Sequence, residues 1–161
     1  MTKLLLQSDD FGLTYGIVDG TIKAVEEGYL KNVGLFVNMD SSKYASERIK
    51  GLDVCLGIDI NLVTGKPISC VDSVPGLVDN EGYFKKSTEI LSTNKVNSQK
   101  KHLFYFEVDP FPYKEVLLET ENQIKKFIEL IGEKPKYINS HSISTPNTEK
   151  AAIVMSKKYE I

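Results

Sequence analysis

The sequence has little of what binds nucleic acid or crosses a membrane. Among 161 residues with a formal net charge of −2, Arg48 is the only arginine, and the lysines are spread along the chain. Neither a basic stripe nor an aromatic stacking motif is present, so we expect no nucleic-acid partner. No apolar run approaches the roughly twenty residues of a membrane span, and the apolar stretch near Met1 is too short for a signal peptide. We therefore expect a cytoplasmic protein without a membrane partner.

Cysteine is also scarce, which argues against a disulfide framework. Cys55 and Cys70 lack a C-x-x-C spacing, and Cys55 lies inside an apolar run where we expect a buried free thiol. The rest of the composition, 41% hydrophobic and 26% charged, is that of an ordinary globular protein. The length is enough for one well-buried core, so we expect a single domain over residues 1–161.

The first apolar run of the chain ends in two adjacent acids. Leu4–Leu6, followed by Asp9 and Asp10, predict a strand buried on both faces with carboxylates at its carboxyl end. Ligands bind at that end of parallel sheets and barrels. A helix cap could explain one acid, but Thr14 is the better placed N-cap. Two adjacent like charges repel unless a cation or a shared proton offsets them.

The rest of the chain alternates between helix and strand patterns, interrupted by one long segment. We expect helices over 14–28, 40–50, 113–131 and 145–158, strands over 32–39, 53–61 and 136–141, and the start of a fifth strand at 159–161. Residues 62–111 lose this periodicity and are predicted to be a long irregular insertion, with 87–101 the best candidate for disorder. Strands that alternate with helices pair in parallel, so the sequence predicts an α/β fold.

Polar side chains gather at the carboxyl ends of the predicted strands. They are Asp9, Asp10, Asn38, Asp59, Asn61, Asn139 and His141. Carboxylates with one imidazole on a single rim are typical of a divalent metal site, open to Mg²⁺, Mn²⁺ or Zn²⁺. Two alternatives remain open: His141 as a surface loop histidine, and Asp59 as a carboxylate hydrogen-bonded to loop amides.

Five segments, in chain order, resemble one protein family. They are Ser8-Asp9-Asp10-Phe11-Gly12-Leu13-Thr14, Leu35-Phe36-Val37-Asn38-Met39, Gly57-Ile58-Asp59-Ile60-Asn61-Leu62 with Thr64-Gly65-Lys66-Pro67, Leu77-Val78-Asp79 with Gly82 and Phe84, and Asn139-Ser140-His141. This ordered set resembles the YdjC-like carbohydrate deacetylases, the chitooligosaccharide deacetylase family. The resemblance implies a (β/α) TIM-like barrel, of which this chain would hold the N-terminal four to five βα units and lack the C-terminal part. It also implies metal-dependent hydrolysis of N-acetyl groups on a small carbohydrate substrate.

The resemblance assigns roles to individual residues. Asp10 and His141 would bind the metal, and Asp9 would be the base that deprotonates the attacking water. The family has a histidine where this chain has Asp59, and two further family histidines are absent after His141. A carboxylate at that position favours Mg²⁺ or Mn²⁺ over Zn²⁺, so we predict a divalent metal held by Asp10, Asp59 and His141. The predicted substrate-binding residues are Asn38, Asn61 and Asn139.

The neighbouring acids cannot share a metal on a regular strand. Successive side chains of a strand point to opposite sides, so Asp9 and Asp10 can both reach the site only if the backbone bends near Phe11–Gly12.

The sequence therefore favours a metal-dependent carbohydrate deacetylase. The alternative is a non-catalytic sugar-binding or regulatory protein that kept the scaffold while its histidines were lost. An open flavodoxin-like sheet that binds a phosphorylated ligand ranks last, because no glycine-rich phosphate loop follows the first strand. Whether two copies form a homodimer is left open.

Overall fold

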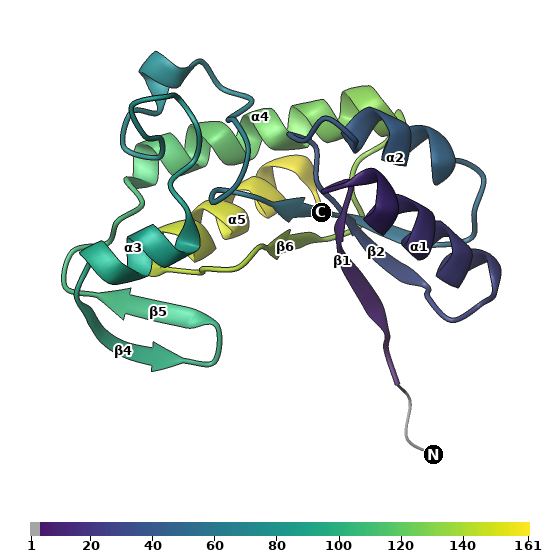
Figure 1. Ribbon diagram of the computed structural model, residues 1–161, viewed down its shortest axis with the longest axis horizontal. Coiled ribbons are helices and arrows are strands. Elements are labelled where there is room, and N and C mark those ends of the chain that lie inside the picture. The colour runs from purple at the N-terminus through teal and green to yellow at the C-terminus, as the bar shows by residue number, and fades with distance from the viewer. Residues whose placement is uncertain (1–3) are drawn as a thin grey trace.

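The computed structural model describes residues 4–161 and contains one parallel sheet of four strands. The sheet order is β1-β2-β3-β6, formed by β1 (Gln7–Phe11), β2 (Asn32–Leu35), β3 (Cys55–Ile60) and β6 (Ile138–Ser140). The main helices are α1 (Tyr15–Glu26), α2 (Ser42–Arg48), α4 (Tyr113–Ile131) and α5 (Pro146–Tyr159) (Figure 1). Strands paired in chain order keep every right-handed crossover on the same side of the sheet. The helices accordingly pack in the row α1-α2-α4-α5, which is the arrangement of a partial (β/α) barrel and confirms the predicted α/β fold.

Local sequence explains where the helices begin and end. Thr14 has an extended backbone, and its side chain accepts a hydrogen bond from Ile17 N, so Thr14 is the N-cap of α1, as predicted. Thr145 caps α5 in the same way through Thr148 N. Helix α4 ends at Gly132, whose φ of 92° is the left-handed conformation that glycine adopts at the end of a helix.

The apolar core lies between the sheet and the helix row. Leu35 and Ile58 are fully buried on the helix side of their strands, and Ile124 and Phe127 of α4 are fully buried against them within one cluster. The opposite face of the sheet carries smaller and more polar residues, because side chains alternate along a strand. These residues are Asp9, Gly34, Gly57, Asp59, Tyr137 and Asn139. This second face is therefore where the polar chemistry of the chain is concentrated.

The N-terminal leucines differ from the prediction. Leu4, Leu5 and Leu6 are exposed and lie before β1, so the prediction that they form a strand buried on both faces is wrong. The first residue of β1 that pairs with β2 is Gln7, opposite Asn32. The leucines extend past that pairing, and no strand within residues 4–161 lies beside them.

The segment 62–111 is more regular than its composition suggests. It contains a 3-10 turn at Val71–Ser73, helix α3 (Ser87–Thr93) and a hairpin of β4 (Val96–Lys100) with β5 (Leu103–Phe106). The disorder predicted for 87–101 is therefore wrong. Ile90 anchors α3 by burial in the core, and β5 supplies the hydrogen bonds that β4 needs.

Two smaller predictions are also wrong. Cys55 is exposed, because it begins β3 on the face opposite the helices, although it is a free thiol as expected. Helix α5 continues to Tyr159, with Glu160 in a left-handed conformation as its C-cap, so residues 159–161 do not start a strand.

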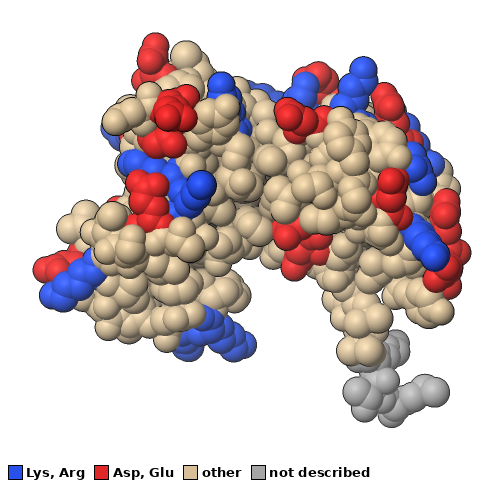
Figure 2. All heavy atoms as spheres, viewed as in Figure 1, with Lys and Arg blue, Asp and Glu red and all other residues tan. Residues whose placement is uncertain are grey.

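Charged side chains of both signs are interspersed on the face drawn in Figure 2. Within residues 4–161, no helix is both long enough and apolar enough to span a bilayer.

An ion-pair cluster between α4 and α5 gives a prediction about pH. Glu121 Oε1 lies 2.8 Å from Lys125 Nζ and 3.0 Å from Lys158 Nζ, and hydrogen bonds from these two lysines lower the pKa of Glu121 to about 2. A lowered carboxyl pKa contributes stability above the unfolded value of 4.5, and this contribution is lost as the pH falls toward 2. Because solvent screens the cluster, we expect Glu121→Gln to lower the free energy of unfolding by about 1 kcal/mol at pH 7.

Urea unfolding at pH 7 and pH 3 checks this prediction. The difference between Glu121→Gln and wild type should shrink at pH 3. Glu129→Gln is the matched control, because Glu129 pairs with Lys126 within α4 and is largely exposed. Equal losses for Glu121→Gln at the two pH values would contradict the linkage.

Candidate active site

The carboxyl end of β1 is bent at the second of the two acids. Asp10 has a φ of 61°, a left-handed conformation that is uncommon for a residue other than glycine. The register between β1 and β2 shifts between Ser8 and Phe11, so Asp10 lies in a bulge. The bend thus occurs at Asp10, just before the predicted position at Phe11–Gly12, and Gly12 follows with a φ of 100°. A bulge re-aims a side chain, which releases Asp10 from the alternation of the strand.

The bulge brings Asp10 to His141. His141 follows β6, and its backbone N donates to Ile60 O, which extends the pairing with β3. Its Nδ1 lies 3.0 Å from Asp10 Oδ1, and its ring packs edge-on against the buried ring of Phe36. Asp10 Oδ1 is buried and has no hydrogen-bond partner within residues 4–161. Two lone-pair donors this close repel each other unless a proton or a cation lies between them.

Asp59 lies next to this pair but faces elsewhere. Its carboxylate is fully buried, with Oδ2 accepting from Asp10 N at 3.1 Å and Oδ1 accepting from Asn139 Nδ2 at 3.0 Å. Burial raises the pKa of Asp59 to about 6; the negative charges of Asp9 and Asp10 add to the rise, while the two hydrogen bonds oppose it. The carboxylate lies against Gly34, where an added Cβ would collide with it. Gly34 is therefore required for Asp59 to occupy this position.

The predicted set of three metal ligands is not assembled. The part of the chain that the structure describes contains no group of three or more His, Cys, Asp or Glu side chains that could hold a metal ion. Both oxygens of Asp59 are engaged in hydrogen bonds, so the structure brings together Asp10 and His141 only. The sequence leaves open that Asp59 is a carboxylate hydrogen-bonded to loop amides. The structure is similar to this alternative, but the donors are a strand amide, Asp10 N, and a side-chain amide, Asn139 Nδ2.

Asp9 remains on the polar face of the sheet. Its Oδ1 accepts from Gln7 Nε2 at 2.6 Å and, more weakly, from Asn139 Nδ2 at 3.4 Å. The same Asn139 amide donates to Asp59, so Asn139 connects the two carboxylates. Tyr137 lies just before β6, two residues before Asn139 and over Gly57, and desolvation followed by the charge of Asp59 raises the pKa of its phenol.

The predicted substrate residues Asn38 and Asn61 organise a loop. Asn61 Oδ1 accepts from Val63 N and Thr64 N, and Asn61 Nδ2 donates to Asn38 Oδ1 and Thr64 O. Asn38 Nδ2 donates to the carbonyls of Thr64 and Lys66. Most of the hydrogen-bonding groups of both amides are used within the protein, which indicates a structural function at the rim.

A buried polar pair on α4 holds the same loop and was missed by sequence reasoning. Glu119 accepts from Ile68 N, Ser69 N and Gln123 Nε2, and Gln123 also bonds both Asn61 N and Asn61 O. Glu119 and Gln123 are fully buried. The available signal was their position, since both fall on the apolar stripe of α4.

Loss of Glu119 should destabilise the protein strongly. Glu119→Ala leaves Ile68 N and Ser69 N without their acceptor and removes one of the two acceptors of Gln123 Nε2, so we expect the free energy of unfolding to fall by at least about 3 kcal/mol. Glu115→Ala is the matched control, because Glu115 lies one turn earlier and, within residues 4–161, its carboxylate accepts a single hydrogen bond, from Gly76 N. Its loss should be about 1 kcal/mol. Thermal or urea unfolding of both variants tests this, and equal losses would contradict the account of the buried pair.

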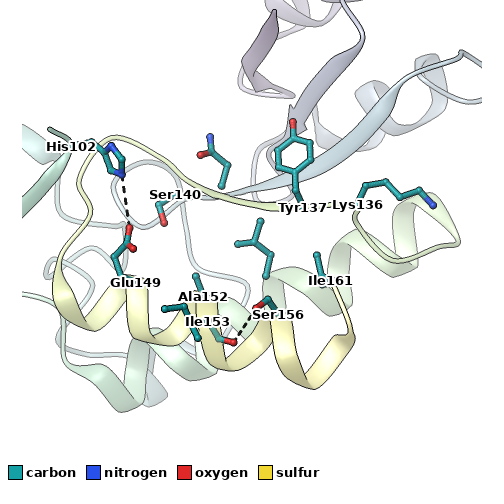
Figure 3. A pocket seen from close by; sticks show the side chains of 11 residues that line it. His102, Lys136, Tyr137, Ser140, Glu149, Ala152, Ile153, Ser156 and Ile161 are labelled. Carbon is teal, nitrogen blue, oxygen red and sulfur yellow. Dashed lines mark hydrogen bonds and ion pairs between the residues drawn. The ribbon is translucent and has the colours of Figure 1, made fainter. Parts of the chain in front are cut away.

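A hollow of about 400 Å³ lies at the free edge of β6, away from the Asp10–His141 pair. Figure 3 shows Tyr137 pointing away from α5, on the opposite side of β6 from Ser156 and Ile161. His102 and Glu149 face each other at the other end of the hollow, with His102 Nε2 3.9 Å from Glu149 Oε1. Asn139 lines the hollow as well, so the hollow borders the residues that Asn139 connects, Asp9 and Asp59.

Comparisons with known proteins show that this chain is similar in sequence to carbohydrate deacetylases. A carbohydrate deacetylase of Thermoanaerobacter pseudethanolicus is 30% identical over 167 residues, covering all of this chain and 59% of that protein. A chitooligosaccharide deacetylase of Escherichia fergusonii is 30% identical over 139 residues, covering 86% of this chain and 48% of that protein. This chain spans about half the length of these curated relatives.

A solved structure shares the fold. It is a crystal structure from Enterococcus faecalis V583, described as a candidate cellobiose-phosphate cleavage protein, with a TM-score of 0.80 and 23% identity over 98% of this chain and 56% of that one. The family model described as YdjC-like protein matches residues 3–161. With nearly its whole length matched, and with the ordered motifs placed around one polar face of a partial barrel, this chain belongs to the YdjC-like protein family.

Proposed function

We propose that this chain carries the metal-binding and base residues of a hydrolase that removes acetyl groups from N-acetylated sugars. The observation that carries the proposal is the buried Asp10 Oδ1, which has no hydrogen-bond partner within residues 4–161 and lies 3.0 Å from His141 Nδ1. A carboxylate oxygen and an imidazole nitrogen are ligands for Mg²⁺, Mn²⁺ and Zn²⁺, so these two residues fit a divalent cation. Relatives named carbohydrate deacetylase supply the reaction type.

Each residue has a defined part in the proposed reaction. When bound at Asp10 and His141, a divalent cation supplies Lewis-acid chemistry that polarises the acetyl carbonyl and acidifies water. Water adds to the carbonyl carbon, and its proton passes to Asp9, whose Oδ1 accepts the hydrogen bonds from Gln7 and Asn139 and whose Oδ2 accepts none from residues 4–161. The C–N bond then breaks as Asp9 returns this proton to the sugar nitrogen, giving acetate and an amine. The Phe36 ring holds the imidazole of His141 in place.

Acetate release from N,N′-diacetylchitobiose tests this proposal. The protein is first treated with EDTA and then assayed with Mn²⁺, Mg²⁺ or Zn²⁺. We expect release that depends on added metal and is absent from Asp10→Asn. Absence of release with every metal would contradict the proposal.

The second candidate function is sugar binding without catalysis. It is favoured by Asp59, which stands where the family has a histidine and whose carboxylate is held in hydrogen bonds. Calorimetric binding of the disaccharide without acetate release would support it over the deacetylase.

A further inference from the structure

We propose that Asp59 is a positioning residue that holds the backbone of Asp10 in its bend, and that it is not a third metal ligand. The inference rests on the proposed function only for its consequence at the metal, because the contact itself joins two residues of this chain. It departs from the ligand assignment that the strand-end position of Asp59 suggests.

The contact that carries the inference is a single hydrogen bond. Asp10 N donates to Asp59 Oδ2 at 3.1 Å, and Asp10 is the residue whose φ is 61°. A left-handed conformation costs roughly 1–3 kcal/mol at a residue other than glycine and persists only where the surroundings hold it. A buried carboxylate that accepts the amide of that residue is such a restraint, since a hydrogen bond to a charged group contributes about 1.5–3 kcal/mol.

Asp59 is itself fixed in place from two sides. Asn139 Nδ2 donates to Oδ1 at 3.0 Å from the neighbouring strand β6. Gly34, on strand β2, leaves the space that the carboxylate occupies. The Asp59 side chain, which comes from β3, therefore joins β6 to the bend of β1 by hydrogen bonds, and β2 leaves the space for it.

The bend in turn aims Asp10 at His141. On a regular strand, Asp10 would point opposite to Asp9, toward the helices. In the bulge, Asp10 Oδ1 lies 3.0 Å from His141 Nδ1. Without Asp59 the backbone at Asp10 would be free to relax, and Asp10 Oδ1 would move away from His141 Nδ1.

Hydrogen exchange at the Asp10 amide in metal-free, ¹⁵N-labelled protein tests the inference. In Asp59→Ala, the Asp10 amide should exchange at least about tenfold faster than in wild type, and Mn²⁺ affinity should fall by at least about tenfold although Asp10 and His141 remain. Asp59→Asn keeps an acceptor for Asp10 N, so its exchange should stay within about threefold of wild type. Unchanged exchange in Asp59→Ala would overturn the inference.

Two further variants keep the test decisive. Gly34→Ala places a methyl group against Asp59 and displaces the carboxylate while its charge is retained, so it should accelerate exchange at Asp10 even if Asp59→Ala does not fold. Asn139→Ala removes the other hydrogen bond of Asp59 and so loosens the carboxylate, and exchange at Asp10 should become faster than in wild type but by less than in Asp59→Ala. If Gly34→Ala leaves exchange unchanged, Asp59 does not restrain Asp10.

The two proposals can fail separately. If wild type binds no Mn²⁺ and releases no acetate, the proposed function fails, while the exchange measurements still report on Asp59. If Mn²⁺ binds but the Asp10 amide exchanges at the same rate in Asp59→Ala as in wild type, the positioning inference alone fails.

Discussion

Replacing Asp9 with asparagine should lower turnover by roughly a hundredfold to ten-thousandfold while leaving metal affinity nearly intact, because this is the usual span for loss of a general base. Asp9 remains on the polar face of β1 and is held by Gln7 Nε2 at 2.6 Å. Asparagine can still accept that hydrogen bond but cannot take a proton from water. The measurement is the rate of acetate release at saturating Mn²⁺, together with a calorimetric Mn²⁺ titration.

Gln7→Ala is the control for the position of Asp9. It removes the hydrogen bond to Asp9 but keeps the carboxylate, so turnover should fall by much less than in Asp9→Asn. Normal turnover in Asp9→Asn would remove the proposed base from the mechanism. Equal loss of metal in Asp9→Asn and Asp10→Asn would show that both acids bind the cation.

Replacing Asp10 with asparagine should lower Mn²⁺ affinity and acetate release together. A neutral amide is a poorer ligand for a hard cation than a carboxylate, and Asp10 and His141 are the two ligands that the geometry of residues 4–161 supports. Loss of groups that merely orient ligands costs about 10–100-fold in metal affinity, so we expect a loss of at least about 100-fold here. Asparagine also tolerates positive φ, so the bend at residue 10 should persist.

Asp53→Asn is the control for the change in net charge. Asp53 Oδ2 lies 2.8 Å from Lys31 Nζ, and the Asp53 side chain is almost fully exposed in the loop before β3. Its Mn²⁺ affinity should match that of wild type. An Asp10→Asn variant that retains wild-type Mn²⁺ affinity would contradict the assignment of Asp10 as a ligand.

The parts of the fold that follow from local periodicity could be predicted from the sequence. The apolar stripe of α4, the cap at Thr14 and the alternation of strands with helices each depend on residues close in the chain, and the structure confirms them. The exposure of Leu4–Leu6 could not be predicted, because burial there depends on a second strand being present at that edge.

The sequence predicted which residues lie near the site, but it could not predict how their side chains are arranged. Strand ends meet at one rim in any parallel sheet, which is why Asp10, Asp59 and His141 were predicted to lie together. The bulge at Asp10 depends on a hydrogen bond to a residue 49 positions away, and no local pattern encodes it. The close approach of the Asp59 carboxylate to Gly34 had one signal in the sequence, because an isolated glycine in a strand often marks such a contact.

The most direct test of the account is a crystal structure of the protein with Mn²⁺, using the anomalous signal of the metal. We expect one peak within about 2.0–2.3 Å of both Asp10 Oδ1 and His141 Nδ1, with Asp59 still bonded to Asp10 N and outside the coordination sphere. A peak bound directly by Asp59, or the absence of any peak between Asp10 and His141, would contradict it.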